Sequence, residues 1–286
     1  MPTSVLVVGA TGTQGGAVVN SLLESDHEYD VYGLTRDTGS SRATALADRG
    51  VEMVEGDLND LASLRPHVER VDAAYGMTDF WSVGSFEGEL EQGENIGAAA
   101  EAAGLDHLVF SSIENCDKQP GAPVIDVKHE IEEAIRGRDV PTTVLWTHNF
   151  MQNFERQREA IVHGEFALPL DEGVRFRLLD VADIGAAVDH ILREPERYRG
   201  RTVELAGDEH TLESMAETFS AVTGVDVKPV RPPIEAVREE MGEGYGDIFE
   251  WHNEREHERE LSEIQAEVPI EFTTLEAYLR ANEWGS

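Results

Sequence analysis

Residues 5–24 read VLVVGATGTQGGAVVNSLLE, an apolar run that is broken by glycines and then becomes an amphipathic helix pattern. Gly9, Gly12 and Gly15 stand at G-x-x-G-x-x-G spacing directly after this first predicted strand. The first glycine permits a tight turn, the second lets the backbone approach a pyrophosphate, and the third allows close packing of helix on strand. The N–H groups and positive dipole of the helix start then face the anion. The stretch therefore predicts a dinucleotide-binding turn.

Short apolar runs alternate with helix patterns over the rest of the chain. The predicted strands are 4–8, 30–35, 52–55, 73–76, 107–111, 142–146 and 202–206, and the predicted helices are 15–24, 41–49, 61–68, 88–103, 127–136 and 182–193. This alternation is typical of a parallel sheet with helices on both faces. We therefore predict an α/β fold, a Rossmann-like doubly wound parallel sheet with a smaller, helix-rich C-terminal lobe. A nucleotide-triphosphate loop is excluded, because the glycine-rich turn lacks the lysine that such a loop needs.

The end of the second strand selects the coenzyme. An NAD site expects an acidic residue there for the ribose 2′-hydroxyl, whereas a 2′-phosphate needs a cation. Here the strand ends in Arg36, whose guanidinium can bind a phosphate through two hydrogen bonds. Arg42 offers a second contact, so we predict NADP(H) in preference to NAD(H); the alternative is that Arg36 pairs with Asp37 on the surface. After the third strand, Asp57 and Leu58 are predicted to meet the adenine edge.

The pattern divides the chain into two parts. Residues 1–150 are predicted to form an NAD(P)-binding Rossmann domain, to which 174–206 return, and residues 151–286 a smaller lobe for a substrate or partner. The sequence TTLE at 273–276 has capping-box spacing, which predicts a last helix from there to about residue 284.

The charge balance restricts which classes of partner the protein can bind and in which cellular environment it would be stable. The 286 residues include 57 acidic and 23 basic ones, a formal net charge of −34, and only three lysines. Such a charge disfavours direct nucleic-acid or membrane binding and suits a salt-rich cytoplasm, as in a halophile; an ordinary acidic enzyme is the alternative. No signal peptide or membrane span is expected, and the single Cys116 suits a reducing compartment.

Several motifs together resemble one family. They are GATGTQGGAVVNSLLE, LTRD, VEGDLND, LVFSSIEN, IDVKHEIEEAIR, VPTTVLWTHNFMQNF and LLDVADIGAAV, in that order over about residues 4–206. The chain resembles the NmrA-like family, its NmrA/HSCARG group, an atypical branch of the short-chain dehydrogenase/reductase superfamily. This resemblance implies a Rossmann fold that binds NADP(H) between the main sheet and the small lobe.

The resemblance also implies roles for individual positions. The diphosphate loop corresponds to Gly9, Gly12, Thr13, Gln14 and Gly15, and the phosphate-binding arginine to Arg36. Thr78 follows the fourth strand, where the family passes the ribose and nicotinamide. Lys128 matches the helix lysine that holds the nicotinamide ribose and assists proton transfer in reductase relatives. The segment closing over the nicotinamide end corresponds to Asn149, Phe150 and Asn153.

Whether the chain can catalyse a reduction depends on the residue four positions before this lysine. The parent superfamily uses Tyr-x-x-x-Lys, in which the lysine lowers the pKa of a tyrosine on the same helix face. Val124 occupies the tyrosine position and donates no proton. Catalysis would need Lys128 as the acid or base, aided by Ser111 or His148, or a substrate such as a quinone that asks little proton chemistry of the protein. The alternative is that Lys128 only clamps the ribose.

Two functions therefore remain open. The first is a regulator or redox sensor that binds NADP(H) and signals to a protein partner, which the missing tyrosine favours. The second is an NADPH-dependent reductase of a small electrophile, a quinone or carbonyl, which Lys128 and Asn153 keep open. Direct DNA binding is disfavoured, because the chain has no basic stripe. His252 and His257 are expected on a solvated helix rather than at a metal, since their spacing does not share a helix face.

Overall fold

A seven-stranded parallel sheet forms the centre of the computed structural model, which describes residues 2–285. The strand order is β10-β6-β5-β4-β1-β2-β3. The bounds are Thr3–Val8 for β1, Tyr29–Thr35 for β2, Glu52–Glu55 for β3, Ala73–Gly76 for β4, His107–Ile113 for β5, Thr142–Thr147 for β6 and Thr202–Leu205 for β10. All seven predicted strands are present, and the predicted fold class is confirmed.

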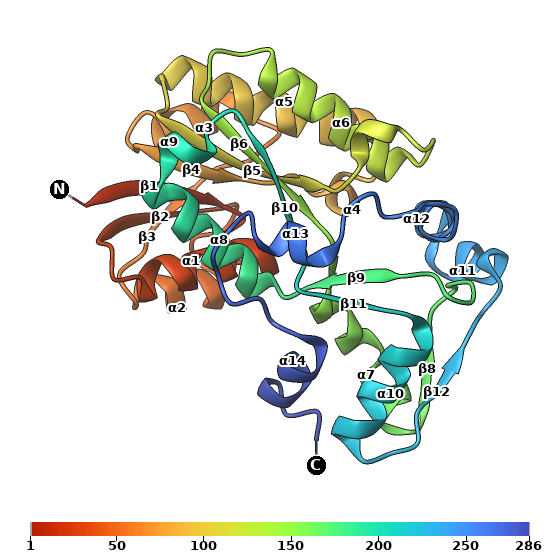
Figure 1. The fold of residues 1–286 in the computed structure, drawn as a ribbon. Helices are drawn as coiled ribbons and strands as arrows, with labels where there is room; N and C mark the ends of the chain where they lie inside the picture. The colour runs from red at the N-terminus through yellow and green to blue at the C-terminus, as the bar shows by residue number, and fades with distance from the viewer. Residues whose placement is uncertain (1, 286) are drawn as a thin grey trace.

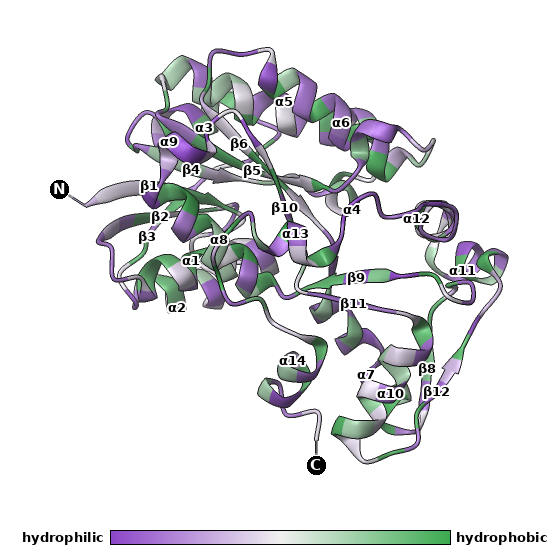
Figure 2. Cartoon of the chain, viewed as in Figure 1, coloured by the Kyte–Doolittle hydropathy of each residue, from purple (hydrophilic) through white to green (hydrophobic). Residues whose placement is uncertain are grey.

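Helices cover both faces of this sheet (Figure 1). The six long ones are α1 (Thr13–Glu24), α2 (Ser41–Ala47), α3 (Leu61–Val68), α5 (Phe86–Ala103), α6 (Pro123–Arg136) and α8 (Val181–Arg193), and the short ones are α4 (Phe80–Val83), α9 (Pro195–Tyr198) and the 3₁₀ turn η1 (Cys116–Lys118). α1 packs on α8 on one side, whereas α5 packs between α3 and α6 on the other. In Figure 2, α5 and α6 carry both green and purple residues, as expected of helices that bury one face.

The first strand shows why the sheet needs both layers. Val5 and Val7 belong to the core under α1 and α8, while Leu6 and Val8 belong to the core under α5 and α6. All four side chains are buried. A strand that is apolar on both faces is stable only when helices cover both of them.

The second lobe holds two small sheets and most of the remaining helices. Its strands are β7 (Asn149–Phe150), β8 (Glu165–Ala167), β9 (Phe176–Leu179), β11 (Asp208–His210) and β12 (Lys228–Val230), and its helices are η2 (Met151–Gln157), α7 (Arg158–Val162), α10 (Leu212–Thr223), α11 (Ile234–Met241), α12 (Glu243–Glu254) and α14 (Leu275–Ala281). The short α13 (Leu261–Gln265) instead contacts β10 of the main sheet. Of the stretch 174–206, α8 and β10 belong to the main sheet layers, whereas β9 pairs with β7 and β11 in a separate sheet.

The last helix differs in detail from its prediction. α14 begins at Leu275, and its N-cap is Thr274, whose hydroxyl accepts from the Ala277 N–H. Thr273 does not cap it, because its N–H and hydroxyl both donate to the buried Asp183 at the start of α8. The chain before α14 is thereby tied to the main sheet layers.

The topology places a crevice above β1. This strand pairs with β2 on one side and β4 on the other, and the chain leaves β1 and β4 toward opposite faces of the sheet. In open α/β sheets, ligands bind at the carboxyl ends of the strands at such a switch point. Within residues 2–285, no helix is long and apolar enough to cross a membrane.

Candidate functional site

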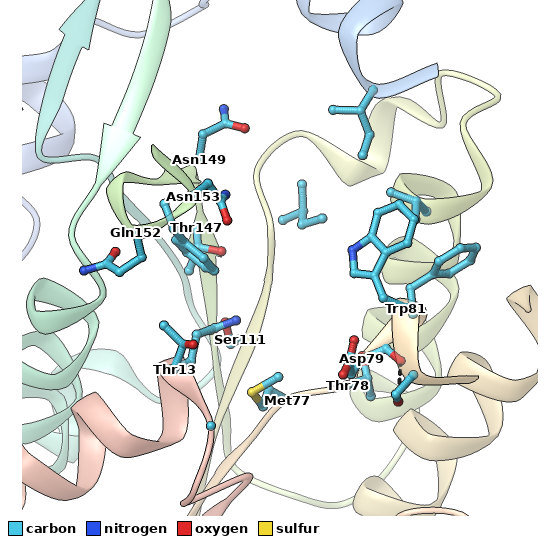
Figure 3. Close-up of a pocket in the computed structure, with 18 of the residues that line it drawn as sticks. Thr13, Met77, Thr78, Asp79, Trp81, Ser111, Thr147, Asn149, Gln152 and Asn153 are labelled. Carbon is cyan, nitrogen blue, oxygen red and sulfur yellow. Dashed lines mark hydrogen bonds between the residues drawn. The ribbon is translucent and has the colours of Figure 1, made fainter. Parts of the chain in front are cut away.

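A cavity of about 1490 Å³ lies at this switch point, between the main sheet and the second lobe. Small-molecule sites usually measure roughly 300–1000 Å³, so this one has room for more than one ligand. Every predicted site residue except Gly15 lines it, namely Gly9, Gly12, Thr13, Gln14, Arg36, Arg42, Asp57, Leu58, Thr78, Ser111, Lys128, Asn149, Phe150 and Asn153. In Figure 3, Thr13 and Thr78 lie near one end of the view and Asn149 and Asn153 near the other.

The glycine turn has the geometry that an anion site requires. Gly9 adopts a φ of +65°, which is costly for any residue with a side chain. Gly15 is absent from the cavity wall because it serves packing: a Cβ there would lie 2.3 Å from the Gly9 carbonyl oxygen. Gly12 is the N-cap of α1 and offers no side-chain cap to the first N–H groups of the helix. These N–H groups are available to a phosphate.

Two arginines stand beside this turn. Arg36 follows β2 and is exposed at the cavity wall. Arg42, in the first turn of α2, donates from Nη1 to the Thr11 carbonyl oxygen at 3.3 Å. Both guanidinium groups therefore border the same end of the cavity as the helix start. In so acidic a chain, two arginines beside one helix start favour the binding of a phosphate there.

The loop after β3 forms the adjoining wall. The Asp57 carboxylate accepts from the Asn59 backbone N–H at 3.0 Å and from its amide at 2.8 Å. Leu58 lies next to it and its carbonyl accepts from Asn95. Asp57 thus fixes the shape of its own loop, and the same loop borders the cavity beside Gly56.

Gln14 links the glycine turn to two strand ends. Its side-chain oxygen accepts from the Tyr75 hydroxyl at 3.0 Å and from the Ser111 hydroxyl at 2.9 Å. Tyr75 is fully buried, and burial raises the pKa of its hydroxyl, so it stays a donor. Because two donors occupy the oxygen, the amide nitrogen of Gln14 is the group left for a ligand.

Lys128, on α6, also lines the cavity. Its Nζ donates to the Thr78 hydroxyl at 2.8 Å and lies 2.5 Å from Oε1 of Glu89. The Glu89 side chain is wholly buried, and that of Lys128 is 10% exposed. Val124, one helical turn before Lys128, also lines the cavity. The ammonium group is therefore held by two partners, with no tyrosine beside it at that position.

The second lobe supplies the facing wall. Asn149 donates its amide to the Arg177 carbonyl oxygen at 3.4 Å, and the amide also lies 3.4 Å from His252. The expectation of a solvated His252 is wrong: the side chain is 4% exposed, and burial holds its pKa well below the usual value. α12 turns this face onto Phe176, whose ring centroid is 4.8 Å from that of His252. His257 lies beyond the end of α12.

Aromatic side chains gather where α4 and α12 meet the cavity. Trp81 on α4 stacks on Tyr245 of α12, with ring centroids 4.4 Å apart and planes 18° apart. The Tyr245 hydroxyl accepts from Arg156 at 2.9 Å. Other aromatic rings on the cavity wall are those of Phe80, Phe150, Phe154, Phe176, Phe249 and Trp251. One part of the cavity is thus apolar and suited to a flat molecule.

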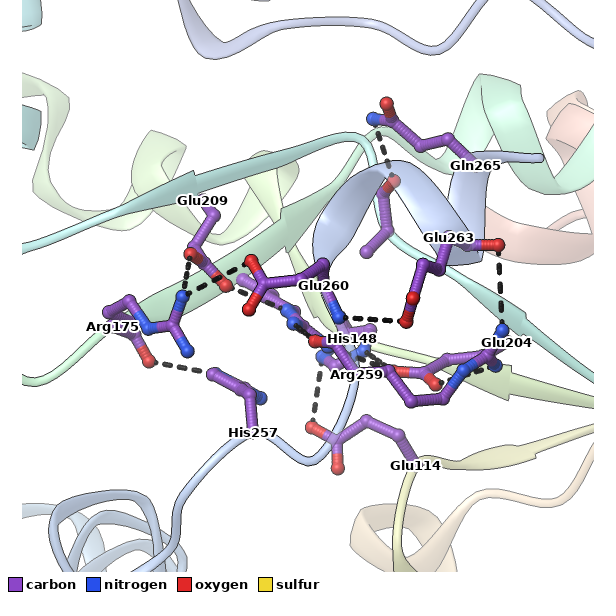
Figure 4. Close-up of polar contacts among 12 residues, drawn as sticks. Glu114, His148, Arg175, Glu204, Glu209, His257, Arg259, Glu260, Glu263 and Gln265 are labelled. Atoms are coloured by element: carbon purple, nitrogen blue, oxygen red, sulfur yellow. Dashed lines mark hydrogen bonds and ion pairs between the residues drawn. The ribbon is translucent and has the colours of Figure 1, made fainter.

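A buried ionic network lies behind this wall (Figure 4). His148 stands between two carboxylates, with Nδ1 3.1 Å from Glu114 and Nε2 2.8 Å from Glu204. Arg255 pairs with Glu114, and Arg177 with Glu204 at 3.2 Å. Nε2 of His148 is hydrogen-bonded to Glu204, while Nδ1 lies close to Glu114 without a well-aligned hydrogen bond. The network fixes the chain after α12 to the ends of β5 and β10.

Sequence reasoning missed several wall residues. Glu89, Trp81 and Tyr245 belong to no recognisable sequence motif. Trp81 and Tyr245 also lie 164 positions apart, so their contact cannot be seen in the sequence. His252 was placed on the wrong face. Only its neighbour Trp251, a large apolar residue in a charged stretch, signals that α12 buries one side.

The comparisons with known proteins agree with this architecture. The model of the NmrA-like family matches residues 1–279. The NmrA-like family domain-containing oxidoreductase FrzB of Cladobotryum sp is 29% identical over 264 residues, which cover 81% of this chain and 77% of that protein.

Two solved structures share the fold. The triphenylmethane reductase of Citrobacter sp., complexed with NADP(H), superposes with a TM-score of 0.83 at 22% identity, covering 97% of this chain and 99% of that one. NmrA, a negative transcriptional regulator in complex with NADP, has a TM-score of 0.77 at 20% identity, with 99% of each chain covered. Since the family model spans nearly the whole sequence, this protein belongs to the NmrA-like family.

Proposed function

We propose that this protein is an NADPH-dependent reductase of a small, flat electrophile such as a quinone or carbonyl compound. The observation that carries the proposal is the size of the cavity together with its aromatic end. The dinucleotide residues occupy one part, and the rings of Trp81, Tyr245 and Phe249 border another. A protein that only sensed the coenzyme would not need this second space.

The coenzyme is proposed to lie along the predicted residues. Its diphosphate would meet the start of α1, where Gly12 leaves the N–H groups uncapped, and the amide nitrogen of Gln14. The preference for NADP(H) over NAD(H) rests on Arg36 and Arg42, because a guanidinium binds a 2′-phosphate by charge-assisted hydrogen bonds. The relatives that contain NADP support binding of the coenzyme.

The chain's own chemistry would be limited to orientation and proton supply. NADPH, when bound, supplies a hydride. Lys128 would hold the inner end of the coenzyme and offer a proton to the reduced acceptor, since Val124 offers none. A quinone suits such a site, because its reduced oxygen is weakly basic and can also take its proton from water.

The two parts of the chain are proposed to divide this work. Residues 1–150, with α8 and β10, would bind the dinucleotide, and residues 151–286 would cover the acceptor. α12 supports this division, because Tyr245 and Phe249 reach the cavity from the second part.

A second candidate is a redox sensor that signals to a protein partner. The observation that favours it is the valine at position 124, combined with a lysine already held by Glu89 and Thr78. The net charge of −34 favours a protein partner over nucleic acid. In this case the coenzyme would bind with no turnover of any acceptor.

The setting is proposed to be a salt-rich, reducing cytoplasm. The net charge supports it, since exposed acidic side chains repel one another at low ionic strength and are screened in molar salt. The lone, buried Cys116 needs no oxidising compartment. Urea unfolding as a function of potassium chloride tests this, with stability expected to rise steadily into the molar range.

The experiment that separates the two functions is oxidation of NADPH by the pure protein in molar salt. A panel of quinones and aldehydes would be compared with Lys128→Ala, and binding of NADPH would be measured in parallel. Turnover that falls in the variant supports the reductase. Tight binding without turnover of any acceptor supports the sensor.

A further inference from the structure

Glu89 is a buried carboxylate on the cavity wall that no sequence motif marks. It lies in the first turn of α5, where its N–H donates to the Ser85 carbonyl oxygen at 3.2 Å. Its side chain is wholly buried, yet it borders the cavity. The positive end of the α5 dipole favours a negative charge at this position.

The two oxygens of Glu89 have different surroundings. Oε1 accepts from both the Lys128 ammonium and the Thr78 hydroxyl, at 2.5 and 2.8 Å. Oε2 is buried, and within residues 2–285 no donor reaches it. Buried carboxylate oxygens are almost always hydrogen-bonded, so an unpartnered oxygen on a residue that lines the cavity points to a ligand donor.

We propose that Oε2 of Glu89 accepts a hydrogen bond from the nicotinamide riboside half of the bound coenzyme. The inference rests on the proposed dinucleotide site and assigns a ligand-binding role to a residue outside the glycine motif. In this arrangement Lys128 and Thr78 also position the Glu89 carboxylate, because both donate to its other oxygen, Oε1.

Charge decides which half of the coenzyme lies against Glu89. The diphosphate and the 2′-phosphate are anions, which a carboxylate repels and which the α1 start and Arg36 attract at the other end. The nicotinamide riboside carries no negative charge of its own. It offers two kinds of donor, the ribose hydroxyls and the carboxamide N–H group, and either matches a carboxylate oxygen.

The structure offers a sharp substitution. Because both protein donors meet the same oxygen, the amide oxygen of Glu89→Gln can keep the bonds from Lys128 and Thr78. The amide nitrogen then replaces Oε2, which turns the acceptor that we propose for the ligand into a donor. The substitution thus changes only the proposed contact between Oε2 and the coenzyme and the charge of the Glu89–Lys128 pair.

The test compares two ligands in molar salt by calorimetric titration. NADPH contains the nicotinamide riboside, whereas 2′,5′-ADP lacks it and reports on the phosphate end. We expect E89Q to weaken NADPH binding on the order of 10- to 100-fold, the loss of one hydrogen bond to a charged group. Binding of 2′,5′-ADP should be unchanged. The control is Glu87→Gln, an exposed acid in the same turn that should change neither.

Unchanged NADPH binding in E89Q, or an equal loss for both ligands, would overturn the inference. If E89Q does not fold, the double variant E89Q/K128Q, which leaves no buried charge, is compared with K128Q alone. It must still bind 2′,5′-ADP and bind NADPH more weakly than K128Q does; equal NADPH affinity of the two variants would overturn the inference there too. Wild-type protein that binds neither ligand refutes the proposed function instead.

A coenzyme analogue identifies the donor. The 3-acetylpyridine analogue of NADPH keeps the ribose hydroxyls and lacks the carboxamide N–H. An E89Q effect that persists with this analogue assigns the contact to a ribose hydroxyl, and an effect that disappears assigns it to the carboxamide.

Discussion

The Ser111 hydroxyl donates to the side-chain oxygen of Gln14 at 2.9 Å, across 97 positions of sequence. Ser111 is one of the predicted catalytic candidates, but its proton is directed at the glycine turn. Tyr75 donates to the same oxygen, which leaves the amide nitrogen of Gln14 available to a ligand. We therefore propose that Ser111 positions the loop that binds the coenzyme.

Replacement of Ser111 by alanine should therefore affect binding and spare turnover. The loss of one neutral hydrogen bond is worth about 0.5–1.5 kcal/mol, so NADPH affinity should fall roughly 2- to 10-fold. The rate at saturating NADPH and acceptor should stay near that of the wild type. Tyr75→Phe removes the other donor and should behave alike. A fall of 100-fold or more in the saturated rate would instead identify Ser111 as a proton donor.

The coenzyme preference should depend on Arg36. In Arg36→Glu the carboxylate repels the 2′-phosphate and can accept from the ribose 2′-hydroxyl of NADH. We expect NADPH affinity to fall on the order of 10- to 100-fold, while NADH binding is kept or improved. Titration of both coenzymes measures this. Arg49→Glu, an exposed arginine outside the cavity, is the matched control. Equal affinities of the wild type for both coenzymes would refute the role of Arg36.

The stacked pair at the cavity mouth should govern the acceptor. Trp81→Ala removes a ring that is 52% exposed and a stacking contact worth about 0.5–1.5 kcal/mol. We expect the KM for a flat quinone to rise several-fold with NADPH affinity unchanged. Tyr245→Phe keeps the stack and loses only the bond from Arg156, so it should resemble the wild type. An equal change in KM for quinones and small aliphatic aldehydes would argue against a stacking role.

The buried network should make the fold sensitive to acid. Burial disfavours the charge of Glu114, but Arg255 and His148 together hold its pKa well below the usual range. A carboxyl whose pKa is lower in the folded than in the unfolded protein stabilises the fold above its unfolded pKa. That contribution is lost as the pH falls from about 5. Urea unfolding in molar salt between about pH 7 and about pH 3 measures the loss.

Glu114→Gln isolates this contribution. It leaves the Arg255 charge buried and unpaired, which costs on the order of 3–5 kcal/mol of stability at neutral pH. The acid dependence should be correspondingly flatter. Asp183 acts in the opposite direction, because burial raises its pKa to about 6 and its contribution therefore falls as the pH rises to that value. If the free energy of unfolding of Glu114→Gln falls below pH 5 as steeply as that of the wild type, Glu114 does not contribute to the acid sensitivity.

Much of the fold could be read from the sequence because its signals are local. The strand from 73 to 76 was predicted to the residue, since its short apolar run and the closing Gly76 are signals that depend only on neighbouring positions. The helix cap at Thr274 was displaced by one residue, because Asp183 competes for Thr273 from a distant element. Helix-capping preferences describe neighbouring residues only, so they cannot predict a competing partner as distant in sequence as Asp183.

The residues of the site also differ in whether local sequence signals can reveal them. The glycine turn and Arg36 are found by spacing. Glu89 is one acid among 57 acidic residues, and only tertiary packing against Thr78 and Lys128 marks it. His252 was misplaced because its stretch reads as uniformly charged, although Trp251 turns that helix onto the core.

In the proposed reaction, this chain transfers a hydride from NADPH to a flat electrophile bound beside it. The most direct measurement is a single turnover of enzyme-bound NADPH with a quinone, compared with NADPH deuterated at the transferred position of C4. We expect oxidation of the coenzyme that requires the acceptor and is slower with the deuterated form. Saturating coenzyme binding with no oxidation by any quinone or aldehyde would contradict it.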